Sequence, residues 1–211
     1  MALQNAVKPE HLVYLEDLDT ATANCSNLLW RGYRIQQPVL DLWVIQEALS
    51  LVKPALVIET GTKYGGSAMY YADLLTLLGG GRVLTVDMHR KHAIQDPRIE
   101  FVIGDSVKET TIQAVRAHAL KAEGPVAVIL DSGHSQAHVS QEMELYAPLV
   151  TKGSFMLVQD GIIDILPRFA SLRPGPLRAI EQFRATHPEF TYSIQDKFLI
   201  TYHPMGWLWK S

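Results

Sequence analysis

Cysteine is almost absent from the sequence, and its absence excludes two kinds of site. Cys25 is the only cysteine among 211 residues, so the chain can form no internal disulfide and no zinc site built from cysteines. We expect Cys25 to behave as a small apolar residue that is buried or half-buried.

Long runs of a single chemical character are also missing. No cluster of lysine and arginine stands out, and the formal net charge is −3 with a pI of about 6.2. A surface for nucleic acid or for anionic lipid therefore has little support. The first twenty residues carry Lys8, Glu10, Glu16 and Asp17 where a signal peptide needs an unbroken apolar run, and no later stretch could span a membrane. We expect a cytoplasmic protein.

Apolar residues are plentiful, at 47% of the chain, and they occur in short runs that alternate with helical patterns. The length and composition suit a single globular domain with a full core. The runs are apolar enough to be strands covered on both faces, and they are Ala55–Glu59, Arg82–Asp87, Ile99–Gly104, Val126–Asp131 and Ser154–Asp160. This rhythm predicts an α/β fold with a doubly wound, mostly parallel, seven-stranded sheet.

Helical patterns separate most of these strands. They cover Glu10–Thr22, Asp41–Val52, Gly66–Leu78, Val107–Lys121, Ser135–Leu149 and Leu177–His187. Two further β-rich runs, Phe190–Ile194 and Lys197–Tyr202, are joined by a short turn, which favours an antiparallel hairpin at the edge of the sheet.

Acidic residues end the predicted strands. In a parallel sheet the ligand crevice lies beyond the carboxyl ends of the strands. A carboxylate stands at or just after each of the five ends, which favours a binding site over the ordinary emergence of strands into water. These positions are Glu59, Asp87, Asp105 after Gly104, Asp131, and Asp160 after Gln159.

The first of these ends opens into a glycine-rich loop, Glu59–Ser67, that includes Gly61, Thr62, Gly65 and Gly66. Its glycine spacing is not that of a dinucleotide-binding loop, and Glu59 would repel phosphate. A cationic ligand suits it better. S-adenosylmethionine carries a sulfonium and an amino group, its ribose could bond to Asp87, and its adenine could lie against Gly104, Asp105 and Ser106, while the glycines allow close approach.

The combination of motifs resembles a known family. "ETGTKYGGSA", "GDS", "LDSGH", "VQD" and "RPGPLRAIEQF" are similar to segments of the cephalosporin-hydroxylase-like and rhamnosyl O-methyltransferase family, over about Trp30 to Trp207. The resemblance implies a class I methyltransferase fold with an edge hairpin. It also implies O-methylation of a sugar or polyhydroxylated natural product, and a homo-oligomer. We expect residues 1–53 to form a helical segment over the cofactor side and 54–211 to form the sheet core.

The resemblance further implies a magnesium site and a base. The family's acidic positions fall on Asp131, Gln159 and Asp160, so one expected glutamate is glutamine here, which could still offer a neutral oxygen but removes a charge. Asp131 also falls in the catalytic set and beside the cofactor. The base falls on His134, whose imidazole could accept the hydroxyl proton near neutral pH. We expect the neighbouring His138 to have only a surface or packing role.

Other functions remain open at this point. Gln159 leaves room for a protein that keeps the fold but has lost turnover and acts as a binding or regulatory subunit. An NAD-dependent oxidoreductase is disfavoured by the glycine spacing and by Glu59. An iron-dependent hydroxylase would need two histidines and a carboxylate on one face, and only His134 is well placed.

Overall fold

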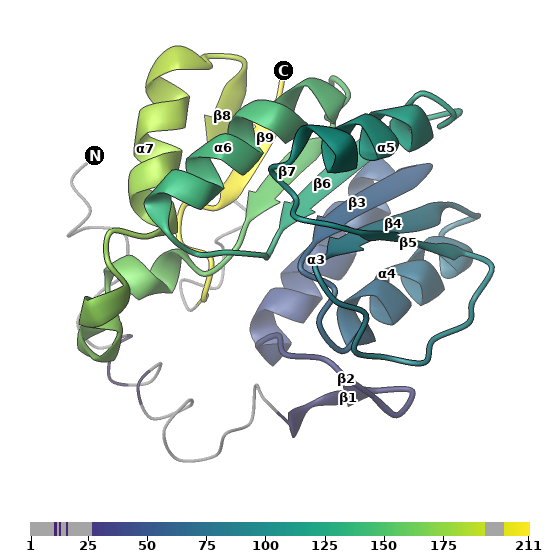
Figure 1. The fold of residues 1–211 in the computed structure, drawn as a ribbon, viewed down its shortest axis with the longest axis horizontal. Helices are drawn as coiled ribbons and strands as arrows, with labels where there is room; N and C mark the ends of the chain where they lie inside the picture. The colour runs from purple at the N-terminus through teal and green to yellow at the C-terminus, as the bar shows by residue number, and fades with distance from the viewer. Residues whose placement is uncertain (1–10, 12, 14–15, 17–26, 193–200) are drawn as a thin grey trace.

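The computed structural model describes residues 11, 13, 16, 27–192 and 201–211, and Figure 1 shows a central sheet between two layers of helices. Seven strands form this sheet in the order β5-β4-β3-β6-β7-β9-β8. Their bounds are Leu56–Thr60 (β3), Arg82–Asp87 (β4), Ile99–Ile103 (β5), Val126–Leu130 (β6), Phe155–Val158 (β7), Phe190–Tyr192 (β8) and Trp207–Lys210 (β9).

The five strands β3 to β7 run parallel to one another. Every residue of β3, β6 and β7 is buried, because helices cover both faces of the central strands. The strand order reverses between β3 and β6, where the chain first runs toward β5 and then toward β7. The predicted α/β sheet with an antiparallel edge is confirmed, and its switch point is where such sheets bind ligands.

The edge of the sheet differs from the sequence prediction in one strand. β8 begins at Phe190 as expected, but its partner is β9, which pairs antiparallel with both β8 and β7. Thr201 and Tyr202, the described end of the run that we expected to be that partner, are outside any strand. The reason is aromatic packing: the Trp207 and Trp209 rings lie 5.3 and 5.7 Å from the ring of Phe155 on β7.

Two hydrophobic clusters place the helices on opposite faces of the sheet (Figure 1). Helices α5 (Glu109–Ala119), α6 (Gln136–Tyr146) and α7 (Pro176–Thr186) cover one face, and α3 (Val39–Val52) and α4 (Gly66–Leu77) cover the other. Among the helices that the structure describes, none has the length and apolar character needed to cross a membrane.

Two segments outside the main sheet lie near the carboxyl ends of its parallel strands. A small antiparallel pair, β1 (Leu29–Trp30) and β2 (Tyr33–Arg34), precedes α3, while the predicted helix Glu10–Thr22 lies almost wholly outside the described residues. After β7, the short 3-10 helices η3 (Gly161–Asp164) and η4 (Pro167–Leu172) lead to α7. Asp164 fixes this connection by accepting the backbone N–H groups of Gly175 and Leu177, both at 2.8 Å.

Candidate active site

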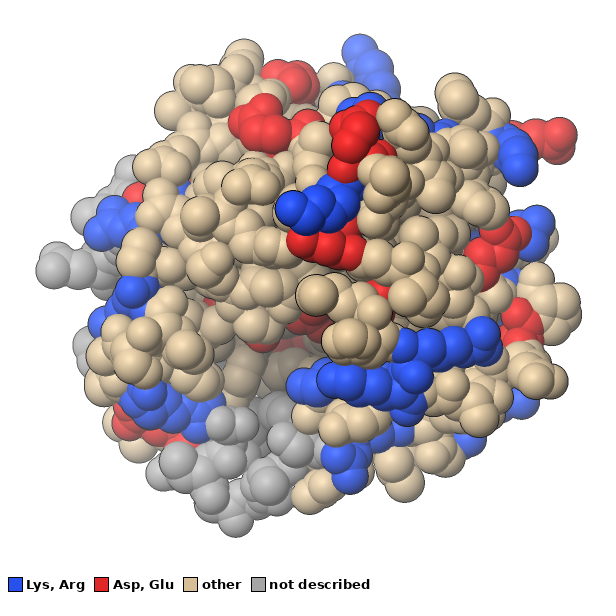
Figure 2. Space-filling view, viewed as in Figure 1, with Lys and Arg blue, Asp and Glu red and all other residues tan. Residues whose placement is uncertain are grey.

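A cavity of about 860 Å³ opens at the carboxyl ends of the strands. Figure 2 shows the molecule hollowed just below its centre, with acidic side chains inside the hollow and lysine and arginine side chains along one side. Most of the predicted site residues line this cavity, namely Gly61, Thr62, Ser67, Asp87, Gly104, Asp105, Ser106, Asp131, His134 and Asp160. Its volume suits a cofactor-sized ligand with room for an acceptor.

Four of the predicted residues, Glu59, Gly65, Gly66 and Gln159, do not line the cavity but support it. Gly66 begins α4 against the N-terminal segment, where an added Cβ would lie 2.2 Å from the Arg34 carbonyl oxygen. Gly61, with φ of +90°, passes so close to β6 that a Cβ would lie 1.9 Å from the Asp131 carbonyl oxygen. Only glycine allows this approach, so the loop leaves bare backbone facing the cavity.

Glu59 lies beneath the loop and is 1% exposed. One carboxylate oxygen accepts a hydrogen bond from the Thr85 hydroxyl, and the other, Oε1, has no hydrogen-bond partner. Burial raises the pKa of Glu59 from 4.5 to about 7, although the hydroxyl groups of Ser67 and Thr85 oppose the change. A buried acid with an unpartnered oxygen provides a negative charge that a cationic ligand would stabilise.

Asp87, at the end of β4, organises the turn beside the loop. Its two carboxylate oxygens accept the backbone N–H groups of Lys63 at 2.8 Å and of His89 at 3.0 Å. The side chain therefore stays at the cavity wall as an acceptor, and the turn Gly104–Ser106 that follows β5 lines the same cavity. The roles expected of these residues, toward a ribose diol and a base, stay predictions.

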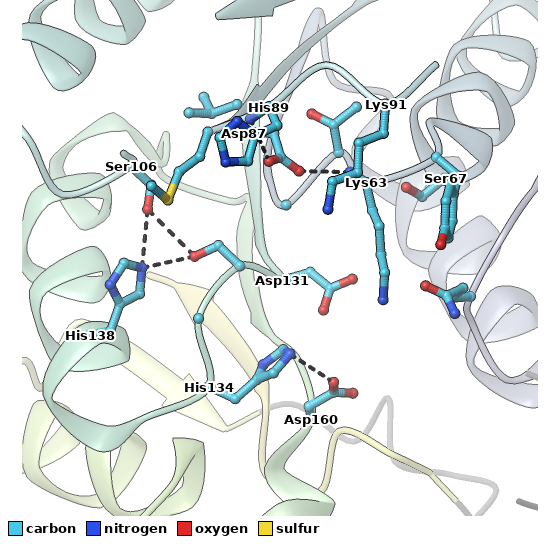
Figure 3. A pocket seen from close by; sticks show the side chains of 18 of the residues that line it. Lys63, Ser67, Asp87, His89, Lys91, Ser106, Asp131, His134, His138 and Asp160 are labelled. Atoms are coloured by element: carbon cyan, nitrogen blue, oxygen red, sulfur yellow. Dashed lines mark hydrogen bonds and ion pairs between the residues drawn. The ribbon is translucent and has the colours of Figure 1, made fainter. Parts of the chain in front are cut away.

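A second group of side chains gathers at the ends of β6 and β7. Asp131, His134 and Asp160 offer ligand atoms that all lie within 4.8 Å of one another, and Figure 3 shows them directed into the same part of the cavity, with Lys63 reaching toward it. Nε2 of His134 lies 3.4 Å from Oδ2 of Asp160. One imidazole and two carboxylates within this distance are a suitable donor set for a divalent cation.

Asp131 is buried beside other carboxylates. Burial raises its pKa well above the usual value, Asp160 and Glu59 raise it further, and Lys63 opposes the change. A cation bound between Asp131 and Asp160 would stabilise both ionised carboxylates. The residues present therefore fit a metal ion.

Gln159 has its amide turned toward Asp131. With its oxygen on that side, the amide accepts from Nε2 of Gln37 at 2.5 Å, but that oxygen then faces the Asp131 carboxylate. With its nitrogen there, the amide donates to Oδ2 of Asp131 at 2.9 Å and its oxygen accepts from Gln37 at 3.2 Å, but the nitrogens of Gln159 and Gln37 then lie 2.5 Å apart. In both orientations the amide oxygen accepts from Gln37, so Gln159 presents no unused oxygen to a cation.

His138, for which the sequence predicts a surface or packing role, lines the cavity. Its Nε2 lies 2.9 Å from the Ser132 hydroxyl and 3.2 Å from the Ser106 hydroxyl. The carboxylate of Glu142, 3.7 Å away, raises the pKa of His138, while burial opposes this. The Ser106 of the "GDS" motif and the i,i+4 spacing of His138 and Glu142 were the available signals.

Comparisons with known proteins show which family this chain resembles. The family model described as rhamnosyl O-methyltransferase/CmcI matches residues 23–211. The rhamnosyl O-methyltransferase of Mycobacterium bovis is 35% identical over 195 residues, which cover 86% of this chain and 80% of that protein. The enzyme of the same name from Mycobacterium leprae is 34% identical over 189 residues, covering 85% and 81%.

Solved structures support the fold. A CmcI structure with Mg and SAM aligns with a TM-score of 0.70 at 20% identity, covering 93% of this chain and 84% of that one. An O-methyltransferase from Bacillus cereus in complex with SAH aligns with a TM-score of 0.53 at 16% identity, covering 87% and 82%. The resemblance predicted from the sequence is therefore confirmed: the chain belongs to the rhamnosyl O-methyltransferase/CmcI family, a family of O-methyltransferases.

Proposed function

We propose that this protein transfers a methyl group from S-adenosylmethionine to a hydroxyl of a sugar or polyhydroxylated natural product, assisted by Mg²⁺. One observation carries the proposal: a single cavity joins the glycine loop and Asp87 to the Asp131, His134 and Asp160 cluster. The relatives at 34 and 35% identity carry the name rhamnosyl O-methyltransferase, which supports a sugar acceptor.

The donor would be held by the loop and the strand ends beside it. The bare backbone at Gly61 and Thr62 receives the methionine part, with Gly65, Gly66 and Ser67 holding the start of α4 in place and the buried Glu59 supplying negative charge below. Asp87 takes the ribose, and Gly104, Asp105 and Ser106 flank the adenine, with Asp131 bordering the methyl end. When bound, the donor supplies an activated methyl group.

Asp131 and Asp160 would hold the cation, and Gln159 would act through Gln37 and Asp131, which its amide contacts. When bound, Mg²⁺ orients the acceptor and lowers the pKa of its hydroxyl. The protein itself places the hydroxyl beside the methyl group, and such positioning can lower the activation barrier by about 7 to 11 kcal/mol. His134 takes the hydroxyl proton, and its Nε2 lies 3.4 Å from Oδ2 of Asp160, which places the imidazole beside the proposed cation site.

The decisive test is transfer of radiolabelled methyl from S-adenosylmethionine to deoxysugars and polyhydroxylated acceptors, with Mg²⁺ or with EDTA. We expect label in the acceptor only when Mg²⁺ is present. Calorimetry with S-adenosylhomocysteine is run on the same protein. Failure to bind it would refute the donor assignment.

A second function, a binding or regulatory subunit without turnover, is favoured by one observation. The amide of Gln159 stands where the resemblance places an acid, and its oxygen already accepts a hydrogen bond from Gln37. Tight binding of S-adenosylhomocysteine with no labelled product over the whole acceptor panel would support this function over the enzyme.

We also propose that the protein is a cytoplasmic homo-oligomer with a single domain, in which residues 1–53 cover the cofactor side. Arg34, Gln36 and Pro38 of that segment line the cavity, which supports the covering role. On α3, Val39, Trp43 and Leu51 are 62, 57 and 70% exposed, an apolar stripe suited to a subunit contact. Light scattering measures the assembly, and a monomeric mass at micromolar concentration would refute it.

A further inference from the structure

A buried hydrogen-bond chain links the Asp131 carboxylate of the candidate cation site to the backbone N–H of Asp160. Its central members are Gln37, just before α3, and His203, just before β9, which are 2 and 1% exposed. They lie 166 positions apart in the sequence. Neither belongs to a motif, and neither lines the cavity.

The hydrogen bond at Asp160 determines which atom donates and which accepts in each of the other hydrogen bonds. The backbone N–H of Asp160 donates to Nδ1 of His203 at 3.0 Å, so Nδ1 must carry a lone pair and Nε2 the proton. Nε2 then donates to Oε1 of Gln37 at 3.3 Å. Because the Gln37 oxygen is thereby engaged, its amide nitrogen faces Asp131 and donates to Oδ2 at 3.1 Å. The orientation of each group follows from that of the one before it.

Two features indicate that these hydrogen bonds hold Asp131 and Asp160 in place. Asp160 has φ of +59°, a left-handed conformation that non-glycine residues seldom adopt without support, and His203 binds the N–H of that residue. At the other end, Oδ2 of Asp131 accepts from Nε2 of Gln37 at 3.1 Å. The Asp131 carboxylate is thus held by a buried amide.

His203 is itself held by its neighbours. Its backbone N–H donates to the Thr201 hydroxyl at 2.9 Å, and that hydroxyl donates to the buried Asp41 of α3. Asp41 also accepts the N–H of Tyr202 at 3.0 Å. The segment before β9 is therefore tied to the start of α3, which brings Gln37 and His203 together.

We propose that Gln37 and His203 are positioning residues that fix the spacing and orientation of Asp131 and Asp160 for a divalent cation. Two carboxylates that face one cation repel each other before it binds, and hydrogen bonds to the Asp131 carboxylate and to the Asp160 backbone hold the two residues in the ligating arrangement. The inference rests on the proposed function for the cation, whereas the hydrogen-bond chain stands on the geometry alone.

The test uses substitutions that break the chain at defined points. Gln37→Met removes the amide at similar length and cuts the link to Asp131. His203→Asn keeps an acceptor near the position of Nδ1 for Asp160 but loses Gln37, and His203→Gln reaches Gln37 but loses the Asp160 contact. Ile180→Ala, in the buried face of α7, is the control for loss of stability at a site outside the cavity lining.

Three quantities are measured below the melting temperature of every variant: Mn²⁺ affinity by electron paramagnetic resonance, S-adenosylhomocysteine affinity by calorimetry, and the His203 tautomer by nitrogen NMR. We expect Gln37→Met and both His203 variants to lose about 10- to 100-fold in Mn²⁺ affinity. Affinity for S-adenosylhomocysteine should change less than about 3-fold, because Gly61, Asp87 and Ser106, which are proposed to bind the donor, take no part in these hydrogen bonds. Ile180→Ala should change neither affinity.

Different results would overturn different statements. Mn²⁺ affinity within about 2-fold of wild type in Gln37→Met, or a His203 that carries its proton on Nδ1, refutes the positioning proposal while leaving the methyltransferase proposal intact. Equal loss of both affinities in every variant, the control included, refutes it as well, because the residues would then act on stability alone. A wild-type protein that binds no divalent cation refutes the proposed metal site and the positioning proposal together.

Discussion

Replacing Glu59 with glutamine should change the way in which the stability of the protein depends on pH. Glu59 is 1% exposed, and burial raises its pKa from 4.5 to about 7. Its Oε1 atom has no hydrogen-bond partner, so folding takes an ionisable oxygen out of water without full compensation. Glutamine has the same shape and does not titrate.

The sign follows from the two pKa values. Below pH 4.5 Glu59 carries the proton in both the folded and the unfolded protein, so its titration does not lower the free energy of unfolding. Between pH 4.5 and 7 the unfolded protein releases the proton while the folded protein keeps it, so the free energy of unfolding falls as pH rises. At about 1.4 kcal/mol per pH unit, the full loss reaches about 3 kcal/mol, and it is nearly complete by pH 8.

Urea unfolding of wild type and of Glu59→Gln at pH 5, 6, 7 and 8 measures this loss. We expect the difference in unfolding free energy between the two proteins to move by about 2 to 3 kcal/mol in favour of the variant between pH 5 and 8. Any constant cost of the amide cancels in this comparison. Glu109→Gln, on the exposed face of α5, controls for removal of a surface carboxylate. Parallel pH profiles for wild type and Glu59→Gln would refute the reasoning.

The remaining predictions concern the cavity. Asp160→Ala should abolish Mg²⁺-stimulated methyl transfer but leave S-adenosylhomocysteine affinity within about 3-fold; equal turnover would contradict the metal assignment. His134→Ala should lower the rate at neutral pH with partial recovery at higher pH, and a pH–rate profile identical to wild type would remove it from the base role. Gly61→Ala should fail to bind S-adenosylhomocysteine in calorimetry, because its Cβ would lie 1.9 Å from the Asp131 carbonyl oxygen. Gln159→Glu should lower the melting temperature without metal and raise Mg²⁺ affinity, since it sets a third carboxylate beside Asp131; unchanged melting would show that the charge is screened there.

The parallel part of the sheet could be predicted because its physical cause is local. Strands covered on both faces must be apolar throughout, so β3, β6 and β7 appear in the sequence as unbroken runs between polar ends. The edge hairpin could not be predicted in the same way. The partner that the structure shows for β8 is Trp207–Lys210, which also pairs with β7 and packs Trp207 and Trp209 against Phe155, a contact between distant parts of the sequence.

The residues that line the cavity could be predicted from the sequence for a related reason. The carboxyl ends of parallel strands lie at one edge of the sheet, so the strand pattern alone predicts that Asp87, Asp131 and Asp160 lie around one cavity. The buried residues behind the cavity wall, Gln37 and His203, could not be predicted from the strand pattern. Gln37 meets Gln159 across 122 positions and His203 across 166, and no spacing within the sequence records these contacts.

Gln159 shows why that difference matters for interpreting the sequence. Considered alone, a glutamine in place of the expected acid indicates a weakened metal site. In the structure, its amide oxygen accepts from Gln37 in either orientation. Gln37 also donates to Asp131, a carboxylate that already has Asp160 and Glu59 as negative neighbours. A glutamate at position 159 would instead add a third negative charge beside Asp131. The effect of residue 159 on the cation therefore depends on residue 37, and the two positions have to be interpreted together.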